Sequence, residues 1–252
     1  MSAYSDEELL ALQRTLYESG NPTRRWLHTT RRDWILERIA NLGKGAGRAL
    51  EVGPGSGVYL PALAEVAEEV VAADIETAYL AQAETLSQQI GHLHCVQDDI
   101  TDTRLPPGNF DLILCTEVIE HIEDSQAALA GLRSLLSDSG VLILSTPQRY
   151  SPLELCAKIA FLPGIIQIVR WIYREPIIET GHINLLTERD LERQLQAAGL
   201  RTREQFKSGF YLPLVAELLG QTGQRFLKWC ESQLRGSWLS GLLWTQYRIL
   251  GK

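Results

Sequence analysis

Short apolar runs alternate with amphipathic segments along most of the chain. Five runs of this kind lie at 48–53, 69–75, 92–100, 110–117 and 140–147. Their apolar residues are continuous and do not alternate with polar ones, which is typical of strands buried on both faces. The segments between them carry apolar residues at helical spacing, and helices between such strands form right-handed parallel crossovers. The pattern therefore predicts a doubly wound α/β sheet.

Beyond residue 147 the pattern predicts two more strands around a long connection. The amphipathic segment 186–199 reads as a helix, with Thr187 as N-cap and Gly199 as the residue that ends it. Two strands are predicted at 200–210 and 242–250, and the sequence between them is mostly helical over 212–235. Together these elements predict a seven-stranded, mostly parallel sheet whose last two strands form an antiparallel edge.

Two helices are predicted before the first strand, over 5–19 and 23–42, and Asn21-Pro22 separates them. Glycines end the second helix shortly before the sheet begins. We therefore expect an N-terminal helical segment over 1–47 and a main domain over 48–252. The main domain would carry a helical insertion at about 148–183.

Charge and cysteine content narrow the class of protein. The 252 residues carry a formal net charge of −7, which argues against a protein whose main task is to coat nucleic acid. The four cysteines are scattered without metal-ligand spacing, and the N-terminus lacks the basic-then-apolar layout of a signal peptide. No apolar run approaches the roughly 20 residues of a membrane-spanning helix. We therefore expect a cytoplasmic protein.

The most distinctive motif is the turn after the first strand. Residues 49–57 read ALEVGPGSG, with Gly53, Gly55 and Gly57 at alternate positions and Glu51 before them. Glycines so spaced let a ligand lie against the backbone, at a helix start that presents unpaired N–H groups. The spacing differs from the dinucleotide pattern G-x-G-x-x-G, and it predicts a cofactor-binding turn.

Polar residues follow the next three strands. Asp74 ends the second strand, where a carboxylate can accept hydrogen bonds from both hydroxyls of a ribose. Asp98 and Asp99 end the third strand, where a carboxylate can accept from an exocyclic amine of a base. Thr116 ends the fourth strand. Because ligands bind outside the carboxyl ends of parallel strands, these residues converge on one crevice, which we expect to hold a nucleoside-bearing cofactor.

These motifs resemble those of the class I S-adenosylmethionine-dependent methyltransferases. ALEVGPGSG resembles the first motif of that family, VQDDITD its adenine-side acid, and NFDLILCTEVIEH and LLSDSGVLILSTP its fourth- and fifth-strand signatures. The resemblance covers residues 48–147 in detail and implies a Rossmann-like fold with S-adenosyl-L-methionine as cofactor. The family more often has Asp at position 51 and Gly at position 98.

The resemblance also implies a role for each motif residue. The methionine part of the cofactor would lie against the glycines of the turn, and Glu51 would support that turn. Asp74 would hold the ribose, and Asp99 with the backbone of Ile100 would hold the adenine, with Asp98 as the alternative acid. Thr116 would face the amino group of the cofactor.

An arginine before the first strand is a further candidate. The segment RRDWI loosely resembles the arginine-bearing segment of quinone O-methyltransferases, where the arginine meets the cofactor carboxylate, and Arg31 is the matching residue. A solvated basic face is the alternative interpretation.

The segment after the fourth strand, EVIEH, places Glu117, Glu120 and His121 within five residues. With His182 these side chains suit a divalent metal such as Mg²⁺. The arrangement resembles those of ubiquinone-biosynthesis O-methyltransferases and of small-RNA 2′-O-methyltransferases, where glutamates and histidines hold a metal. Three interpretations stay open: a metal site formed by these four residues, His121 as a metal-free base or substrate contact, and a capped helix start.

An apolar and aromatic stretch over 150–178 follows the fifth strand and also carries basic residues. Placed over the crevice, it would form a lid that sets substrate specificity. Apolar helices with basic and aromatic flanks also suit a membrane interface, which adds peripheral membrane contact as a second interpretation. Packing against 212–244 is the third.

The leading hypothesis is methyl transfer to an oxygen of a small hydrophobic acceptor, quinone-like or lipid-like, because the insertion is apolar and the chain is acidic. His121 is the candidate catalytic residue, as a base that deprotonates the acceptor. An RNA 2′-O-methyltransferase is the enzymatic alternative, although nucleic acid would require a basic groove. A cofactor-binding module without catalysis and a nicotinamide oxidoreductase are the remaining alternatives.

Overall fold

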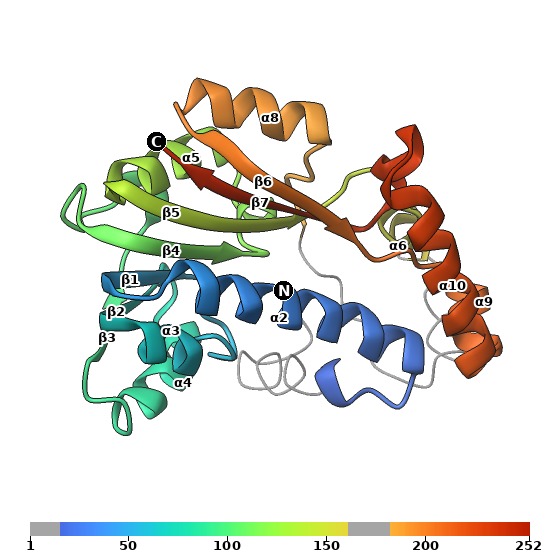
Figure 1. Ribbon diagram of the computed structural model, residues 1–252, viewed down its shortest axis with the longest axis horizontal. Helices are drawn as coiled ribbons and strands as arrows, with labels where there is room; N and C mark the ends of the chain where they lie inside the picture. Colours follow the sequence, from blue (N-terminus) through green and yellow to red (C-terminus); the bar gives the residue numbers. More distant parts are fainter. Residues whose placement is uncertain (1–15, 161–181) are drawn as a thin grey trace.

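The computed structural model describes residues 16–160 and 182–252, which form one seven-stranded sheet with helices on both faces (Figure 1). The strand order is β3-β2-β1-β4-β5-β7-β6. The strands run over Ala46–Val52 (β1), Ala67–Asp74 (β2), Leu93–Gln97 (β3), Phe110–Thr116 (β4), Leu136–Pro147 (β5), Arg201–Ser208 (β6) and Thr245–Gly251 (β7).

Pairing is parallel on one side of the sheet and antiparallel on the other. β1 pairs in parallel with β2 and with β4, and the same direction continues to β3 and β5. β7 lies between β5 and β6 and pairs antiparallel with both. The predicted mostly parallel sheet with an antiparallel edge is therefore confirmed. Its strand order reverses between β1 and β4, where open α/β sheets bind their ligands.

The helices divide between the two faces. Trp34, Ile35 and Leu60 belong to the core on one face, and Leu129 and Leu191 to the core on the other. The helices run over Pro22–Leu42 (α2), Leu60–Val66 (α3), Thr77–Ser87 (α4), Ser125–Leu135 (α5), Pro152–Ala160 (α6), Glu188–Ala197 (α8), Pro213–Leu218 (α9) and Gly220–Arg235 (α10), with 3-10 turns at Leu16–Glu18 (η1), Ile100–Asp102 (η2), Ile119–His121 (η3) and Trp238–Leu242 (η4).

The second predicted helix is α2, and its start is set by Asn21. The side-chain oxygen of Asn21 accepts from the backbone N–H groups of Thr23 (2.9 Å) and Arg24 (3.1 Å), which is N-capping. The helix predicted over 5–19 lies outside the described residues, apart from η1. α2 runs along the sheet and shares its core, so the end of the predicted N-terminal segment packs with the main domain.

Some boundaries differ from the prediction for local reasons. The helical sequence over 212–235 forms two helices, because Gly220 adopts a φ of 47° and the chain turns there. β5 starts earlier than predicted because Leu136 already has extended dihedral angles that end α5. Thr187 caps α8 and Gly199, with a φ of 74°, follows it, as predicted.

A smaller apolar cluster joins α2 to the C-terminal third. Leu27 of α2, Ala216 of α9 and Leu227 of α10 pack together, with α6 against them. Figure 1 shows α6, α9 and α10 beyond the carboxyl ends of β4 and β5. Of the insertion predicted at 148–183, residues 161–181 lie outside the described residues, so the lid and its membrane contact stay predictions. Within the described ranges, no helix has the length and apolar character needed to cross a membrane.

Candidate active site

The glycine turn after β1 adopts a backbone that glycine takes most easily. Gly53, Gly55 and Gly57 have φ angles of 70°, 48° and 69°. A Cβ on Gly53 would come within 2.5 Å of Cγ2 of Val118, so the turn packs directly against the segment after β4. The turn therefore lies between the ends of β1 and β4, at the predicted cofactor position.

Glu51 carries a buried carboxyl group at the end of β1. The residue is 2% exposed, and its Oε2 has no hydrogen-bond partner in the part of the chain that the structure describes. Burial raises the pKa of this carboxyl group well above its ordinary value. Buried polar atoms are rarely left without a partner in native structures. A ligand that brings an ammonium or N–H group to the glycine turn would supply the missing partner.

The two acids after β3 differ in the use of their oxygens. Asp98 uses both, since Oδ2 accepts from the Thr103 hydroxyl (2.5 Å) and Oδ1 from the Arg104 N–H (2.8 Å). Asp99 uses Oδ1 alone, which accepts from the N–H (2.9 Å) and hydroxyl (2.7 Å) of Thr101. Oδ2 of Asp99 has no partner within the described ranges, which favours Asp99 over Asp98 as the ligand-binding acid.

The other predicted cofactor residues also lie at strand ends. Asp74 ends β2, where burial raises the pKa of its carboxyl group and Oδ1 accepts from the Glu76 N–H (2.9 Å). Ile100 is buried at the start of η2, and Thr116 is the last residue of β4, opposite Ser145 of β5. The sheet thus brings the acids and the glycine turn to one edge.

Arg31 is turned inward and is not part of a solvated face. Its Nη1 lies 2.6 Å from Oε2 of Glu117, and its guanidinium lies 5.7 Å from the ring centroid of Trp244. Glu117 has a φ of 56°, which is uncommon for a residue other than glycine. Its Oε1 accepts from the Ser145 hydroxyl (2.9 Å). The carboxylate of Glu117 is therefore held by Arg31 and Ser145 beside the glycine turn.

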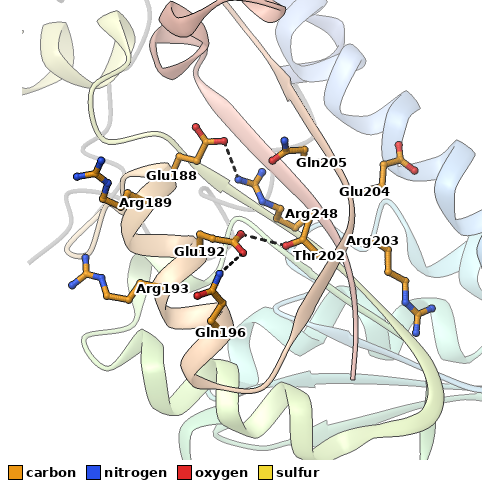
Figure 2. A pocket seen from close by; sticks show the side chains of 10 residues that line it. All are labelled: Glu188, Arg189, Glu192, Arg193, Gln196, Thr202, Arg203, Glu204, Gln205 and Arg248. Carbon is orange, nitrogen blue, oxygen red and sulfur yellow. Dashed lines mark hydrogen bonds and ion pairs between the residues drawn. The ribbon is translucent and has the colours of Figure 1, made fainter.

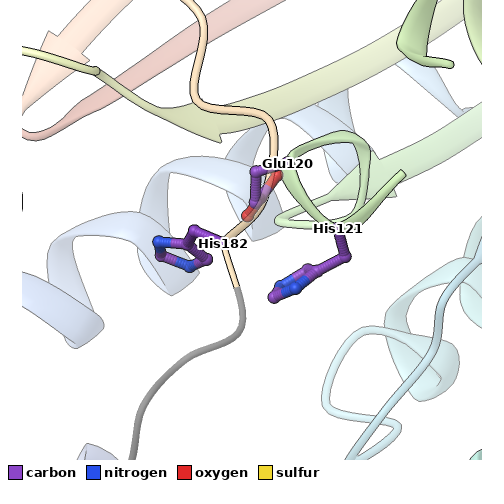
Figure 3. A group of neighbouring side chains, drawn as sticks. All are labelled: Glu120, His121 and His182. Carbon is purple, nitrogen blue, oxygen red and sulfur yellow. The ribbon is translucent and has the colours of Figure 1, made fainter. Parts of the chain in front are cut away.

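Glu120, His121 and His182 form a cluster at the end of β4 (Figure 3). One ligand atom of each lies within 4.8 Å of the other two, and the imidazole centroids are 5.1 Å apart. Three of the four predicted metal ligands are therefore brought together. Glu117 is not in this group, because its carboxylate faces Arg31.

Glu120 is the buried member of the cluster. Its Oε2 accepts from the Thr146 hydroxyl (3.0 Å), while Oε1 has no partner among the residues described. Burial, and secondarily the charge of Glu117, raise the pKa of the Glu120 carboxyl group well above its ordinary value. Its backbone carbonyl accepts from the N–H groups of Ile183 and Asn184, both at 3.0 Å. These two bonds fix the segment that carries His182.

Glu154 of α6 is a site residue that the sequence did not reveal. Its buried carboxylate lies with Oε2 at 3.3 Å from Nδ1 of His182, and its Oε1 accepts from Nε1 of Trp244 (3.0 Å). With Nδ1 turned to Glu154, Nε2 is the His182 nitrogen left to face the cluster. The only sequence feature that could have pointed to Glu154 is that it is a single acid in the apolar stretch 150–160.

A separate open groove lies between α8 and the edge strand β6 (Figure 2). Some of its polar side chains contact one another: Glu192 accepts from Gln196 (3.0 Å) and Thr202 (3.4 Å), and Glu188 faces Arg248 (3.4 Å). None of the predicted site residues lines this groove. The residues that the sequence predicts for cofactor binding and catalysis lie instead around the glycine turn and the strand ends.

A family model described as a methyltransferase domain matches residues 24–205, which is more than half of the chain. The chain belongs to the class I S-adenosylmethionine-dependent methyltransferases. The matched range includes the glycine turn, the strand-end acids and His121. The fold and the methyl donor predicted from the motifs are thereby confirmed.

Curated relatives match part of the chain. A ubiquinone biosynthesis O-methyltransferase of Xanthomonas campestris pv. campestris (strain B100) is 33% identical over 125 residues, covering 49% of this chain and 51% of the relative. A protein of the same name from Psychrobacter arcticus is 26% identical over 186 residues, covering 71% of this chain and 68% of the relative. The chain thus spans about half the length of the Xanthomonas relative.

Solved structures show the same fold at low sequence identity. The magnesium protoporphyrin IX methyltransferase of Synechocystis PCC 6803, solved with bound SAH, superimposes with a TM-score of 0.61 at 16% identity. The match covers 97% of this chain and 94% of that one. The likeness in fold therefore extends over nearly the whole chain.

Proposed function

We propose that this methyltransferase transfers the methyl group to an oxygen of a small hydrophobic acceptor of quinone-like or lipid-like chemistry. The observation that carries the proposal is the position of His121. It follows β4 three residues after Val118, the side chain that packs against Gly53 of the glycine turn. In this proposal His121 is the proton acceptor next to the glycine turn. The relatives named as ubiquinone biosynthesis O-methyltransferases support oxygen as the acceptor atom.

In this proposal the strand ends hold S-adenosylmethionine. The glycine turn takes the methionine part, and Oε2 of Glu51 accepts a hydrogen bond from its ammonium group, which the unpartnered buried oxygen supports. Asp74 accepts from the ribose hydroxyls, and Oδ2 of Asp99 with the Ile100 backbone takes the adenine amine. Arg31 retains further N–H donors for the cofactor carboxylate, because Glu117 engages one nitrogen of a group with five donors.

The chemistry needs positioning and one proton transfer. His121 removes the proton from an acceptor hydroxyl, and the oxygen attacks the methyl carbon in line with the sulfonium sulfur. A carbon–oxygen bond forms while the carbon–sulfur bond breaks, and the electron pair stays on sulfur in S-adenosylhomocysteine. Glu154 holds the ring of His182, which lies against His121.

A site for a divalent cation is the alternative to His121 as a metal-free base, because an imidazole nitrogen that binds a cation cannot also accept the proton. Oε1 of Glu120, unpartnered and buried, together with His121 and His182 would supply one oxygen and two imidazole nitrogens. This donor set suits an ion of the Zn²⁺ type better than Mg²⁺, which prefers an all-oxygen shell. Such an ion would orient an acceptor oxygen and lower the pKa of its hydroxyl.

A panel of acceptors tests the proposal. The purified chain is incubated with S-adenosylmethionine and a hydrophobic catechol, a hydrophobic amine or a small RNA, and S-adenosylhomocysteine release is measured. We expect turnover with the catechol, and a loss of about 10²-fold or more in His121→Gln with unchanged cofactor affinity. Turnover with the amine or the RNA alone would replace the proposed acceptor, and cofactor binding without turnover on any acceptor would favour a non-catalytic module.

Chelation tests the cation separately. Dialysis against a chelator followed by elemental analysis measures metal bound to the wild-type chain and to Glu120→Gln. A metal that is retained by the wild type and lost in the variant supports the site. No retained or rebound metal in either protein contradicts it.

A further inference from the structure

Within the described ranges, the helical hairpin of α9 and α10 presents an exposed apolar and aromatic face. We call it the α9–α10 face. Its large apolar side chains are between 47% and 70% exposed, and they are Leu214, Leu218, Leu219, Phe226 and Trp229. Exposed apolar residues scattered singly are normal on a protein surface, whereas a group of this size rimmed by polar residues marks an interaction surface.

The exposure of this face does not come from loose packing. Ala216 and Leu227, on the opposite sides of the two helices, are fully buried in the cluster that joins α2. Gly223 lies so close to the carbonyl of Val215 that a Cβ would collide with it, which locks the two helices together. The rings of Phe226 and Trp229 stack with centroids 6.2 Å apart. The face is therefore a formed surface on a rigid support.

The exposed charge on α10 is basic. Arg225 and Lys228 are exposed, and the spacing of four residues places Arg225 beside Trp229 on the helix surface. Both acids in the sequence 212–235 are buried or nearly so and engaged. Glu217 pairs with Arg24 (3.1 Å), and Glu231 accepts from the backbone N–H of Gly209 (2.8 Å) and pairs with Arg235.

This charge stands out against the chain as a whole, which carries a net charge of −7. An apolar and aromatic surface with a basic rim complements the interface of an anionic bilayer, where rings and aliphatic side chains enter the headgroup boundary and basic groups meet phosphates. A second copy of the same face would oppose Arg225 and Lys228 to their own like charges. The charge pattern therefore favours lipid over self-association.

We propose that the α9–α10 face docks this methyltransferase on the surface of an anionic lipid bilayer. Figure 1 shows α9 and α10 beyond the carboxyl ends of β4 and β5, the same side of the sheet as the active site. Docking through this face turns the active-site end of the sheet toward the membrane. The inference rests on the exposed surface and holds whichever acceptor the enzyme uses.

Vesicle co-sedimentation of the purified chain tests the proposal. The vesicles are equimolar phosphatidylglycerol and phosphatidylcholine, compared with phosphatidylcholine alone. We expect the wild type to sediment with the anionic vesicles. Its affinity for the neutral vesicles should be at least about tenfold lower, since each basic group near the surface contributes about 1 kcal/mol. Raised salt should weaken the anionic binding.

Three variants separate the contributions of the face. Phe226→Gln with Trp229→Gln should reduce partition into anionic vesicles about tenfold or more, because it removes the apolar area that enters the bilayer. Arg225→Gln with Lys228→Gln should remove most of the preference for anionic vesicles. Leu42→Gln is the matched control, an exposed apolar residue at the opposite end of α2, and should bind vesicles as the wild type does.

Thermal unfolding and S-adenosylhomocysteine affinity of each variant report whether the fold is intact. Trp229→Gln alone, at a 60% exposed position, is the substitute if the double variant unfolds. A wild type that stays in the supernatant with anionic vesicles overturns the proposal, and so does equal binding by the face variants. A concentration-dependent dimer that the face variants abolish would assign the face to a second copy and also overturn it.

Discussion

Nη1 of Arg31 and Oε2 of Glu117 lie 2.6 Å apart, and this ion pair joins α2 to the end of β4 beside the glycine turn. The two side chains are 13% and 19% exposed, so the pair is largely withdrawn from water. Glu117 also keeps a positive φ and a hydrogen bond from the Ser145 hydroxyl. The pair thus fixes the start of the segment that carries Glu120 and His121.

Breaking this pair on one side should be worse than removing it altogether. Arg31→Gln leaves the largely buried Glu117 without its counter-charge, and we expect a loss of about 2–4 kcal/mol in the free energy of unfolding. Urea unfolding of both single variants and the double variant with Glu117→Gln measures the coupling. The pair Arg32–Asp33, which is more exposed than Arg31–Glu117, supplies the control, since Arg32→Gln should change stability by less than about 0.5 kcal/mol. Additive losses would contradict the account.

We expect the buried carboxyl group of Glu51 to lower the free energy of unfolding at neutral pH while it contributes to cofactor binding. Its raised carboxyl pKa means that the folded state holds a proton that the unfolded state releases, so stability is lost as the pH rises above the ordinary value of about 4.5. We expect Glu51→Gln to be more stable than the wild type at neutral pH and to bind S-adenosylhomocysteine about tenfold more weakly.

Calorimetric titration and thermal unfolding across the pH range measure both effects of Glu51→Gln. The exposed Glu65→Gln serves as the control and should change neither quantity. A Glu51→Gln variant that binds S-adenosylhomocysteine as tightly as the wild type would remove Glu51 from the cofactor site.

His28 should make the fold sensitive to acid. Burial, and then the charges of Arg31 and Arg24, lower its pKa from 6.5 to about 3. Because the unfolded state takes up a proton first, stability is lost as the pH falls from about 6.5 toward 3, by about 1–2 kcal/mol between pH 7 and 5. His28→Gln should flatten this part of the profile in urea unfolding. The exposed His94→Gln should keep the wild-type slope, and an unchanged slope in His28→Gln would refute the assignment.

Glu154 should act through His182. Replacing it with Gln keeps the volume but withdraws a carboxylate from Nδ1 of His182, and removing such orienting partners typically reduces activity about 10–100-fold. We expect kcat to fall while the KM for S-adenosylmethionine stays unchanged. Glu188→Gln, on α8 in the groove of Figure 2, is the matched control and should retain full kcat. Equal changes in kcat and KM would indicate a merely structural role.

The sheet, and the position of the glycine turn and the acids at its strand ends, could be predicted because local sequence patterns encode them. Continuous apolar runs, the positive-φ glycines and Asp74 need no distant partner to be recognised. The ion pair between Arg31 and Glu117 could not be predicted, because it depends on a contact between α2 and the end of β4 that the spacing of residues in the sequence does not encode. Glu154 escaped notice for the same reason, since its partners His182 and Trp244 are distant in sequence.

The destination of the methyl group tests the central claim most directly. S-adenosylmethionine with a deuterated methyl group is supplied with an equimolar mixture of a hydrophobic catechol and a small RNA, and products are read by mass spectrometry. The account predicts the labelled methyl on a catechol oxygen, with little label in His121→Gln and none on RNA. Label on the RNA, or on an atom of the catechol other than oxygen, would contradict it.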